Sequence, residues 1–212
     1  MSDYLTHGRI AVSALPRALP RDSYALHQAL WRLFPKAPPP PPSRPFLCRW
    51  QENGDHLDLF LLSSVAPSPP DWGPGLRWTC RELPPDFPAA RSYRFALSAN
   101  PSKKLRCDGT GKITKNGRRV ALETAEELQS WLRRKLEASG CRLVNAVIAD
   151  GSWRCGRRDG QAISHGAVEF QGLLEVVDAP LFQRDWRQGF GSAKAFGFGL
   201  MLLFPHYNTT GE

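Results

Sequence analysis

The chain has 212 residues, of which 42% are hydrophobic and 23% are charged, and its formal net charge is +8. This length fits one large domain or two domains of about 100 residues each, and the apolar content excludes an intrinsically disordered chain. The longest apolar stretches are too short or too interrupted to cross a bilayer, and the start of the chain, MSDYLTHGRI, does not resemble a secretory signal. We therefore expect a globular cytoplasmic protein with no membrane partner.

The first half of the chain predicts one helix among four strands. The helix is capped by Asp22 or Ser23 and runs to Leu33. The segment 35–45 is rich in proline; we expect a stiff connector there, the alternative being a ligand for an aromatic groove. The strands are expected at 4–12, 46–51, 56–65 and 76–83. This order is most of a βαββαβ unit whose second helix is reduced.

The second half predicts the same order with both helices. A helix capped by Thr124 covers 125–138, and a shorter helix covers 179–188. The strands are expected at 92–98, 142–149, 165–177 and 199–204, with a possible hairpin turn at 157–160. We therefore predict an α+β fold with two tandem ferredoxin-like (RRM-like) βαββαβ domains. The proline-rich hinge at 84–88 separates an N-terminal domain, 1–88, from a C-terminal domain, 89–212.

The positive charge is concentrated in residues 91–142, the basic block, which hold thirteen Lys and Arg against five Asp and Glu. Such a block favours a polyanion such as nucleic acid, the alternative being a solvated surface that only aids solubility. Three glycines interrupt the block, which predicts a mobile basic loop able to follow phosphates. The candidates for RNA contact in this loop are Lys103, Lys104, Arg106, Lys115, Arg118 and Arg119.

Residues 189–199, the glycine loop, contain two Gly-aromatic-Gly triplets around a centre that includes Lys194. Glycine allows positive φ, so that successive backbone N–H groups can converge on an anion. The loop is not a dinucleotide fingerprint, because Lys194 occupies the place of the third glycine in G-x-G-x-x-G. We favour a cradle for an RNA backbone; the alternative is a glycine bend that permits close packing.

Two side chains of the first predicted helix could transfer protons. Tyr24 and His27 are three residues apart and share a helical face, and imidazole titrates near neutral pH. Because that face is rotated from the stripe of Leu26, Leu30 and Leu33, we expect both rings near the surface. A lone histidine on a helix is more often a packing or surface residue, so the spacing alone does not make His27 catalytic.

Metal and cofactor sites find no support in the sequence. The five cysteines contain no C-x-x-C pair, and no carboxylate cluster has convincing spacing, so we expect no metal and no cofactor. If RNA is cut, the ribose 2′-hydroxyl would attack the adjacent phosphorus. The products would be a 2′,3′-cyclic phosphate and a 5′-hydroxyl end, and the protein would supply proton transfer and charge stabilisation.

Three motifs in chain order resemble the CasE family, the CRISPR RNA-processing endoribonuclease of the type I-E Cascade complex. They are RDSYALHQALWRLFP at 21–35, FALSANP at 95–101, and the glycine loop. The resemblance extends over essentially the whole chain. It implies two ferredoxin-like domains, cleavage of repeat RNA at the base of a hairpin without metal, and retention of the product within Cascade.

The resemblance also implies roles for particular residues. His27 would be the general acid or base, and Tyr24 would orient or stabilise the reacting groups. The RNA would be held by two arginines of the predicted hairpin turn and by the glycine loop, that is, by Arg157, Arg158, Gly189, Gly191, Lys194, Gly197 and Gly199.

The implied partners are a CRISPR repeat RNA hairpin, the other Cascade subunits, especially the backbone subunit, and target DNA through the assembled complex only. Two alternatives stay open: a non-catalytic RNA-binding subunit of a guide-RNA complex, and a scaffold whose basic block is incidental.

Overall fold

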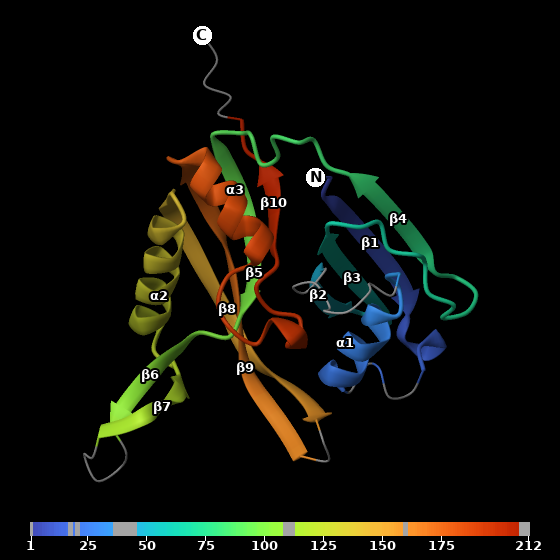
Figure 1. The fold of residues 1–212 in the computed structure, drawn as a ribbon, viewed down its shortest axis with the longest axis horizontal. Coiled ribbons are helices and arrows are strands. Elements are labelled where there is room, and N and C mark those ends of the chain that lie inside the picture. The colour runs from blue at the N-terminus through green and yellow to red at the C-terminus, as the bar shows by residue number, and fades with distance from the viewer. Residues whose placement is uncertain are drawn as a thin grey trace.

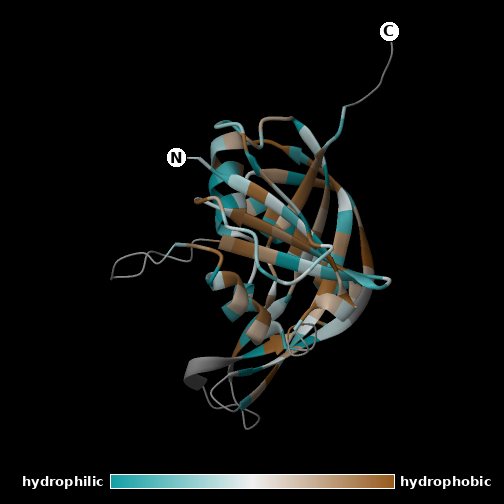
Figure 2. Ribbon diagram, turned by 90° about the vertical axis from the view of Figure 1, so that its right-hand side faces the viewer, coloured by the Kyte–Doolittle hydropathy of each residue, from teal (hydrophilic) through white to brown (hydrophobic). Residues whose placement is uncertain are grey.

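Two four-stranded antiparallel sheets lie next to each other, and helices cover each of them (Figure 1). The structure is a computed structural model and describes residues 2–16, 19, 22–35, 46–107, 113–158 and 161–207. Most of the proline-rich connector therefore lies outside the described residues. Apolar and polar residues alternate along the strands in Figure 2, as expected for sheets with one buried face.

The N-terminal half forms the first sheet, in the order β2-β3-β1-β4. Its elements are β1 (Tyr4–Ala11), the 3-10 turn η1 (Val12–Ala14), α1 (Ser23–Trp31), β2 (Phe46–Asn53), β3 (His56–Ser63) and β4 (Arg77–Glu82). The crossover through α1 joins β1 to β2, and β3 lies between them, which is the split βαβ arrangement of a ferredoxin-like unit. Residues 64–76 join β3 to β4 without a helix, so the predicted loss of the second helix is confirmed.

The C-terminal half forms the second sheet, in the equivalent order β10-β5-β9-β8. Its elements are β5 (Ser92–Ala99), α2 (Ala125–Ala138), β8 (Cys141–Arg158), β9 (Gln161–Val176), α3 (Ala179–Gln188), the 3-10 turn η2 (Lys194–Phe196) and β10 (Met201–Pro205). Both helices are present here, and Leu132, Phe170 and Trp186 lie in the core between helices and sheet. The predicted α+β class and the tandem ferredoxin-like topology are confirmed. The domain boundary after residue 88 stays a prediction.

The predicted mobile basic loop is wrong for the part that the structure describes. β6 (Ser102–Cys107) and β7 (Ile113–Ala121) form an antiparallel ribbon that projects from the C-terminal sheet (Figure 1). Pairing runs from Ser102 opposite Ala121 to Leu105 opposite Arg118, and after a register shift Cys107 lies opposite Ile113. A high content of charged residues does not prevent two segments from pairing through their backbones, which is why the ribbon forms. Two of the three glycines that predicted the loop fall in 108–112, outside the described residues.

The second and third predicted strands of this half are longer than expected. β8 and β9 form one hairpin with arms of 18 and 16 residues. Asp150 and Gly151 interrupt the apolar pattern and predict the end of a strand, yet a β-bulge between Ala149 and Ser152 accommodates them. The extension carries the end of β8 to the N-terminal half. Among the described residues no helix is long and apolar enough to cross a membrane.

Candidate functional site at the seam between the two sheets

The two halves meet at a seam that α1 and β2 form with β8 and η2. Asp22 begins α1 as its N-cap, because its Oδ1 accepts hydrogen bonds from the backbone N–H groups of Tyr24 (2.9 Å) and Ala25 (3.0 Å). Its Oδ2 accepts another from the backbone N–H of Arg157 in β8 (3.2 Å). One carboxylate therefore starts the helix and ties it to the other half.

Gly156 makes this approach possible. A Cβ atom at Gly156 would lie 2.8 Å from Oδ1 of Asp22 and 3.0 Å from the backbone nitrogen of Tyr24. Any larger residue would push β8 away from α1. The sequence motifs did not single out Gly156, because the need for a glycine arises only from the contact between the halves.

His27 is buried, with only 5% of its surface exposed, so the expectation that its ring lies near the surface is wrong. The ring packs among those of Tyr24 (6.5 Å between centroids), Trp31 (6.1 Å) and Phe46 (5.4 Å). The helical face beside the leucine stripe would face solvent on an isolated α1. In the folded protein Phe46, Trp31 and the seam cover that face.

The hydrogen bond from Trp31 defines which nitrogen of the His27 imidazole carries the proton in this conformation. Its Nε1–H donates a hydrogen bond to Nε2 of His27 over 3.0 Å. Indole nitrogen is only a donor, so Nε2 is the acceptor, and the single proton of the neutral ring lies on Nδ1. Trp31 itself is 36% exposed and therefore lies between the imidazole and solvent.

The glycine loop reaches the same place. The ring of Phe196 lies 6.3 Å from that of Tyr24, which is half-buried. Positive φ is confirmed at all four glycines proposed to hold RNA, Gly189, Gly191, Gly197 and Gly199.

Packing accounts for at least two of these glycines. A Cβ atom would lie 2.2 Å from the indole of Trp50 at Gly197 and 2.7 Å from Leu47 at Gly189. A glycine bend that permits close packing therefore explains these positions without a ligand. RNA contact by the four glycines stays a prediction. Lys194 is half-buried, and its ammonium donates a hydrogen bond to the carbonyl oxygen of Gln188.

Two arginines share one carboxylate inside the seam, a cluster that the sequence reading missed. Nη2 of Arg49 in β2 donates to Oε2 of Glu169 in β9 over 2.9 Å, and Nη2 of Arg154 in β8 lies 4.0 Å from Oε1 of Glu169. The side chains of Arg49 and Arg154 are only 4% and 11% exposed. An arginine in the otherwise apolar run Phe46–Trp50 was the available signal.

Burial controls the electrostatics of this cluster. It lowers the pKa of Arg154 to about 10 and lowers that of Arg49, while the charge of Glu169 opposes both shifts. The guanidinium of Arg154 also lies 4.4 Å from the ring centroid of Trp50, a cation–π contact, and donates to the Trp50 carbonyl oxygen over 2.9 Å. β2 and β8 are thus held together beside α1.

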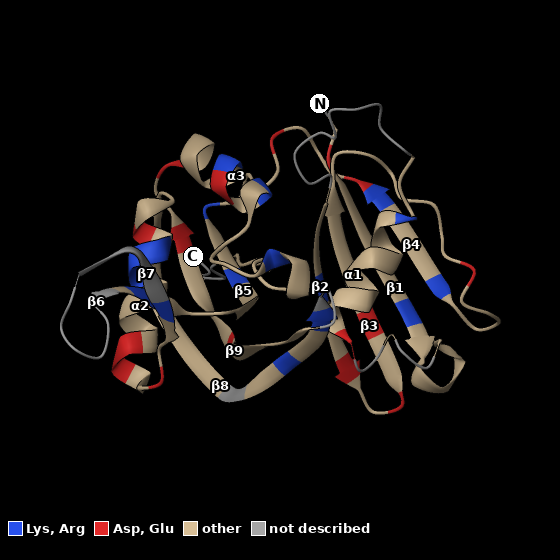
Figure 3. Ribbon diagram, turned by 60° about the horizontal axis from the view of Figure 1, so that its bottom comes forward, with Lys and Arg blue, Asp and Glu red and all other residues tan. Residues whose placement is uncertain are grey.

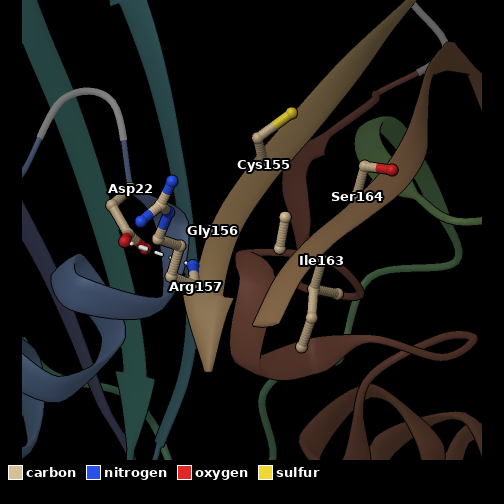
Figure 4. A pocket seen from close by; sticks show the side chains of 7 residues that line it. Asp22, Cys155, Gly156, Arg157, Ile163 and Ser164 are labelled. Atoms are coloured by element: carbon tan, nitrogen blue, oxygen red, sulfur yellow. Dashed lines mark hydrogen bonds between the residues drawn. The ribbon is translucent and has the colours of Figure 1, made fainter. Parts of the chain in front are cut away.

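An open pocket of about 290 Å³ lies where α1 meets the end of the β8–β9 hairpin (Figure 4). It is lined by Asp22, Cys155, Gly156, Arg157, Ala162, Ile163 and Ser164. His27 does not line it; the pocket instead opens at the residue that caps its helix. Figure 4 shows the Arg157 side chain extending past Asp22 at this opening. In the described part of the chain, no group of three His, Cys, Asp or Glu side chains could hold a metal ion.

The remaining predicted RNA contacts, except Arg158 at the end of β8, lie on the ribbon. Lys104 and Arg119 are exposed there, whereas Lys103 forms an ion pair with Glu127 over 2.7 Å, which lowers the pKa of that carboxyl. Figure 3 shows blue bands on α2 and β8 as well. The side chains of Arg106, Lys115, Arg118 and Arg158 lie outside the described residues, so their contacts stay predictions.

The sequence and the fold both match known proteins over nearly the whole chain. A family model described as "CRISPR associated protein" matches residues 4–205. The "CRISPR system Cascade subunit CasE" of Escherichia coli K12 is 31% identical over 197 residues, which are 90% of this chain and 96% of the relative. The "CRISPR-associated endoribonuclease Cse3" of Thermus thermophilus is 31% identical over 213 residues, 93% of this chain and 88% of the relative.

Solved structures show the same fold. The crystal structure of Cas6e from Escherichia coli K-12 superposes with a TM-score of 0.72 at 28% identity and covers 96% of this chain and 100% of its own. Thermus thermophilus Cse3, bound to an RNA that represents a pre-cleavage complex, superposes with a TM-score of 0.75 at 27% identity, covering 97% and 100%. These matches confirm the resemblance read from the three motifs, and the chain belongs to the CRISPR-associated protein family that includes CasE and Cse3.

Proposed function

We propose that this protein is a metal-independent endoribonuclease that cleaves CRISPR repeat hairpins in precursor RNA to give mature guide RNA. One observation carries the proposal: the helix with Tyr24 and His27 is tied through Asp22 to the basic end of β8, beside an open pocket. The proposal draws further support from the name of the relative Cse3, an endoribonuclease, and from its structure with a pre-cleavage RNA.

The reaction is an internal transesterification. The 2′-oxygen forms a bond to phosphorus and the bond from phosphorus to the 5′-oxygen breaks, which leaves a 2′,3′-cyclic phosphate and a 5′-hydroxyl. His27 accepts the proton of the 2′-hydroxyl or donates one to the leaving 5′-oxygen. Tyr24 orients the reacting groups, and its hydroxyl stabilises the charge that develops on the phosphorane.

RNA has to uncover His27 before it can react. The imidazole is closed off in the present conformation, and Nε2 is bonded to the indole of Trp31. Trp31 is the most exposed of the three rings around His27, and rotation of its indole would release Nε2 and open a path to it. In this proposal RNA binding and the movement of Trp31 are coupled.

The ribbon and the glycine loop would hold the hairpin. Lys104 and Arg119 contact the stem phosphates, and so do Arg106, Lys115, Arg118 and Arg158, because A-form RNA is recognised mainly by its shape and phosphates. Lys103 joins them by exchanging Glu127 for a phosphate. The cleaved hairpin stays bound within a cytoplasmic Cascade complex, against the backbone subunit, and target DNA is met only through that assembly. The relative CasE is itself named a Cascade subunit.

Cleavage of the cognate repeat RNA by the purified protein in excess EDTA tests the chemistry. We expect full activity, and no activity when the nucleotide at the cleaved position lacks its 2′-hydroxyl, since that group is the nucleophile. Loss of cleavage in EDTA would show that a metal ion takes part. Activity on the 2′-deoxy RNA would rule out the transesterification.

The burial of His27 favours a second candidate, a non-catalytic subunit that binds guide RNA. Such a subunit would bind RNA through the same ribbon and would not need the imidazole of His27. The two candidates differ in what the purified protein does to the repeat RNA. The endoribonuclease cuts it and loses that activity with His27→Ala, whereas the non-catalytic subunit binds the RNA equally well with or without His27 and gives no product.

A further inference from the structure

The aromatic side chain of Trp153 is not part of the hydrophobic core and takes no part in the proposed reaction. It lies on β8 and is 69% exposed. Its neighbour across the hairpin is Gly166, and a Cβ atom at that glycine would meet nothing within 4 Å. The hairpin therefore presents an indole beside open space, with no side chain at the opposite position.

Trp153 shares its side of the hairpin with the pocket. Side chains alternate along a strand, so Trp153, Cys155 and Arg157 point the same way. Cys155 and Arg157 both line the pocket, as does Ser164, which pairs with Cys155. Trp153 and Arg157 are four positions apart, which places their Cα atoms about 13 Å from each other along the strand. The indole is thus one end of a surface that continues into the pocket.

The surroundings of Trp153 differ from those of an apolar docking patch. Val147 is the exposed apolar residue of the hairpin whose exposure matches that of Trp153, and it pairs with Gln171, whereas Trp153 pairs with Gly166. Gln171 and Gly166 are five residues apart on β9, so Val147 and Trp153 lie on opposite faces. An isolated aromatic ring followed by a cation suits a nucleobase and its phosphate, because every base has a π-face that stacks on an aromatic ring.

We propose that Trp153 is a stacking platform for an unpaired nucleobase next to the hairpin stem, and that Arg157 binds a phosphate beside it. The inference rests on the proposed function and deepens it: the substrate would be a hairpin with a single-stranded flank, and the flank would contribute to recognition. Nothing in the proposed cleavage chemistry requires this contact, so affinity and cleavage test different statements.

The experiment measures dissociation constants for two RNAs, the repeat hairpin with its unpaired flanks and the same hairpin trimmed to the stem, both 2′-deoxy at the cleaved nucleotide. Trp153→Ala should weaken binding of the flanked hairpin by at least about fivefold, which is the lower range for loss of one stacked base. Trp153→Phe should keep most of the affinity. Neither variant should change binding of the trimmed hairpin, and Val147→Ala, equally exposed on the other face, should change neither.

A test without any protein variant uses flanks in which one nucleotide at a time lacks its base. One such abasic position should weaken binding to the wild-type protein as much as Trp153→Ala does, and combining the two changes should add nothing. Equal effects of Trp153→Ala on flanked and trimmed hairpins would overturn the platform. So would unchanged RNA affinity together with lost association with other Cascade subunits, which would assign Trp153 to a protein contact. If the wild-type protein binds both 2′-deoxy RNAs as expected but does not cut the corresponding hairpins with an all-ribose backbone, the proposed cleavage is wrong and the stacking platform stands.

Discussion

The two halves of the chain share one strand order and differ in what they add to it. The N-terminal half keeps a single helix and is close to neutral, with nine Lys and Arg against eight Asp and Glu in residues 1–90. The C-terminal half has both helices, a projecting ribbon and the basic block. The groups that can move a proton thus belong to one half and most of the cations to the other. Cleavage and affinity should therefore be separable by mutation.

The largest effect is expected from His27→Ala in the N-terminal half. Loss of a proton-transfer group should lower single-turnover cleavage of the repeat hairpin by about 100-fold or more while RNA affinity stays nearly unchanged. His56→Ala is the matched control, because His56 lies in the same half, at the start of β3 next to a turn. Equal cleavage rates for His27→Ala and the wild type would contradict the assignment of proton transfer to the N-terminal half.

The seam should show its contribution in stability. Glu169→Gln leaves Arg49 and Arg154 buried together without a carboxylate, and we expect a loss of roughly 2 to 3 kcal/mol in the free energy of unfolding, measured with urea. Glu175→Gln is a close control: Glu175 is on the same strand and, like Glu169, is 29% exposed, but its partner Arg142 is exposed. That change should cost at most about 1 kcal/mol. Equal losses in the two variants would mean that the cluster does not hold the halves together.

The ribbon should control affinity and its salt dependence. Lys104→Ala removes one expected phosphate contact, so RNA binding should weaken several-fold at ~0.1 M salt, and the slope of log K against log salt should fall by about one. Arg81→Ala removes an exposed arginine from β4 of the N-terminal half and should change neither quantity. A slope that Lys104→Ala leaves intact would remove the ribbon from the RNA interface.

The smallest effect concerns pH. Burial lowers the pKa of His165, whose ring lies 4.5 Å from that of Phe196 in the glycine loop. The folded state thus disfavours the protonated ring, so His165 contributes stability that is fully present above pH ~6.5 and is lost as the pH falls through the lowered value. The urea concentration at the midpoint of unfolding should decrease as the pH is lowered from ~7.5 to ~5. In His165→Phe this decrease should be smaller. An unchanged pH profile would show that His165 does not cause it.

Much of the fold follows from local sequence rules. The N-cap at Asp22 and the helix after Thr124 are where the capping residues predict them, and Gly140 ends α2 with positive φ. The strand order of both halves follows from the succession of strands and helices. Tyr24 and His27 could be selected because their spacing on one helix is a local property.

The local pattern was misleading wherever a distant segment supplies the decisive contact. Asp150 and Gly151 predict the end of a strand, but pairing with β9 continues past them. Glycines in the basic block predict a loop, but β6 and β7 pair with each other into a ribbon. Backbone pairing is a long-range interaction whose partner is absent from any local window, and it outweighs weak local preferences.

The amino-acid sequence by itself determined the two-unit topology, the location of the charge and the helix that carries the imidazole, because all three depend on residues close together in the chain. Only the tertiary structure decided that His27 is buried, that Gly156 must be a glycine, and that Arg49 and Arg154 share Glu169. These features arise where segments that are distant in sequence pack against each other: Phe46 covers His27 within the N-terminal half, whereas Gly156 and the two arginines lie where the halves meet. Burial is a property of such contacts and cannot be seen in any local window of the sequence.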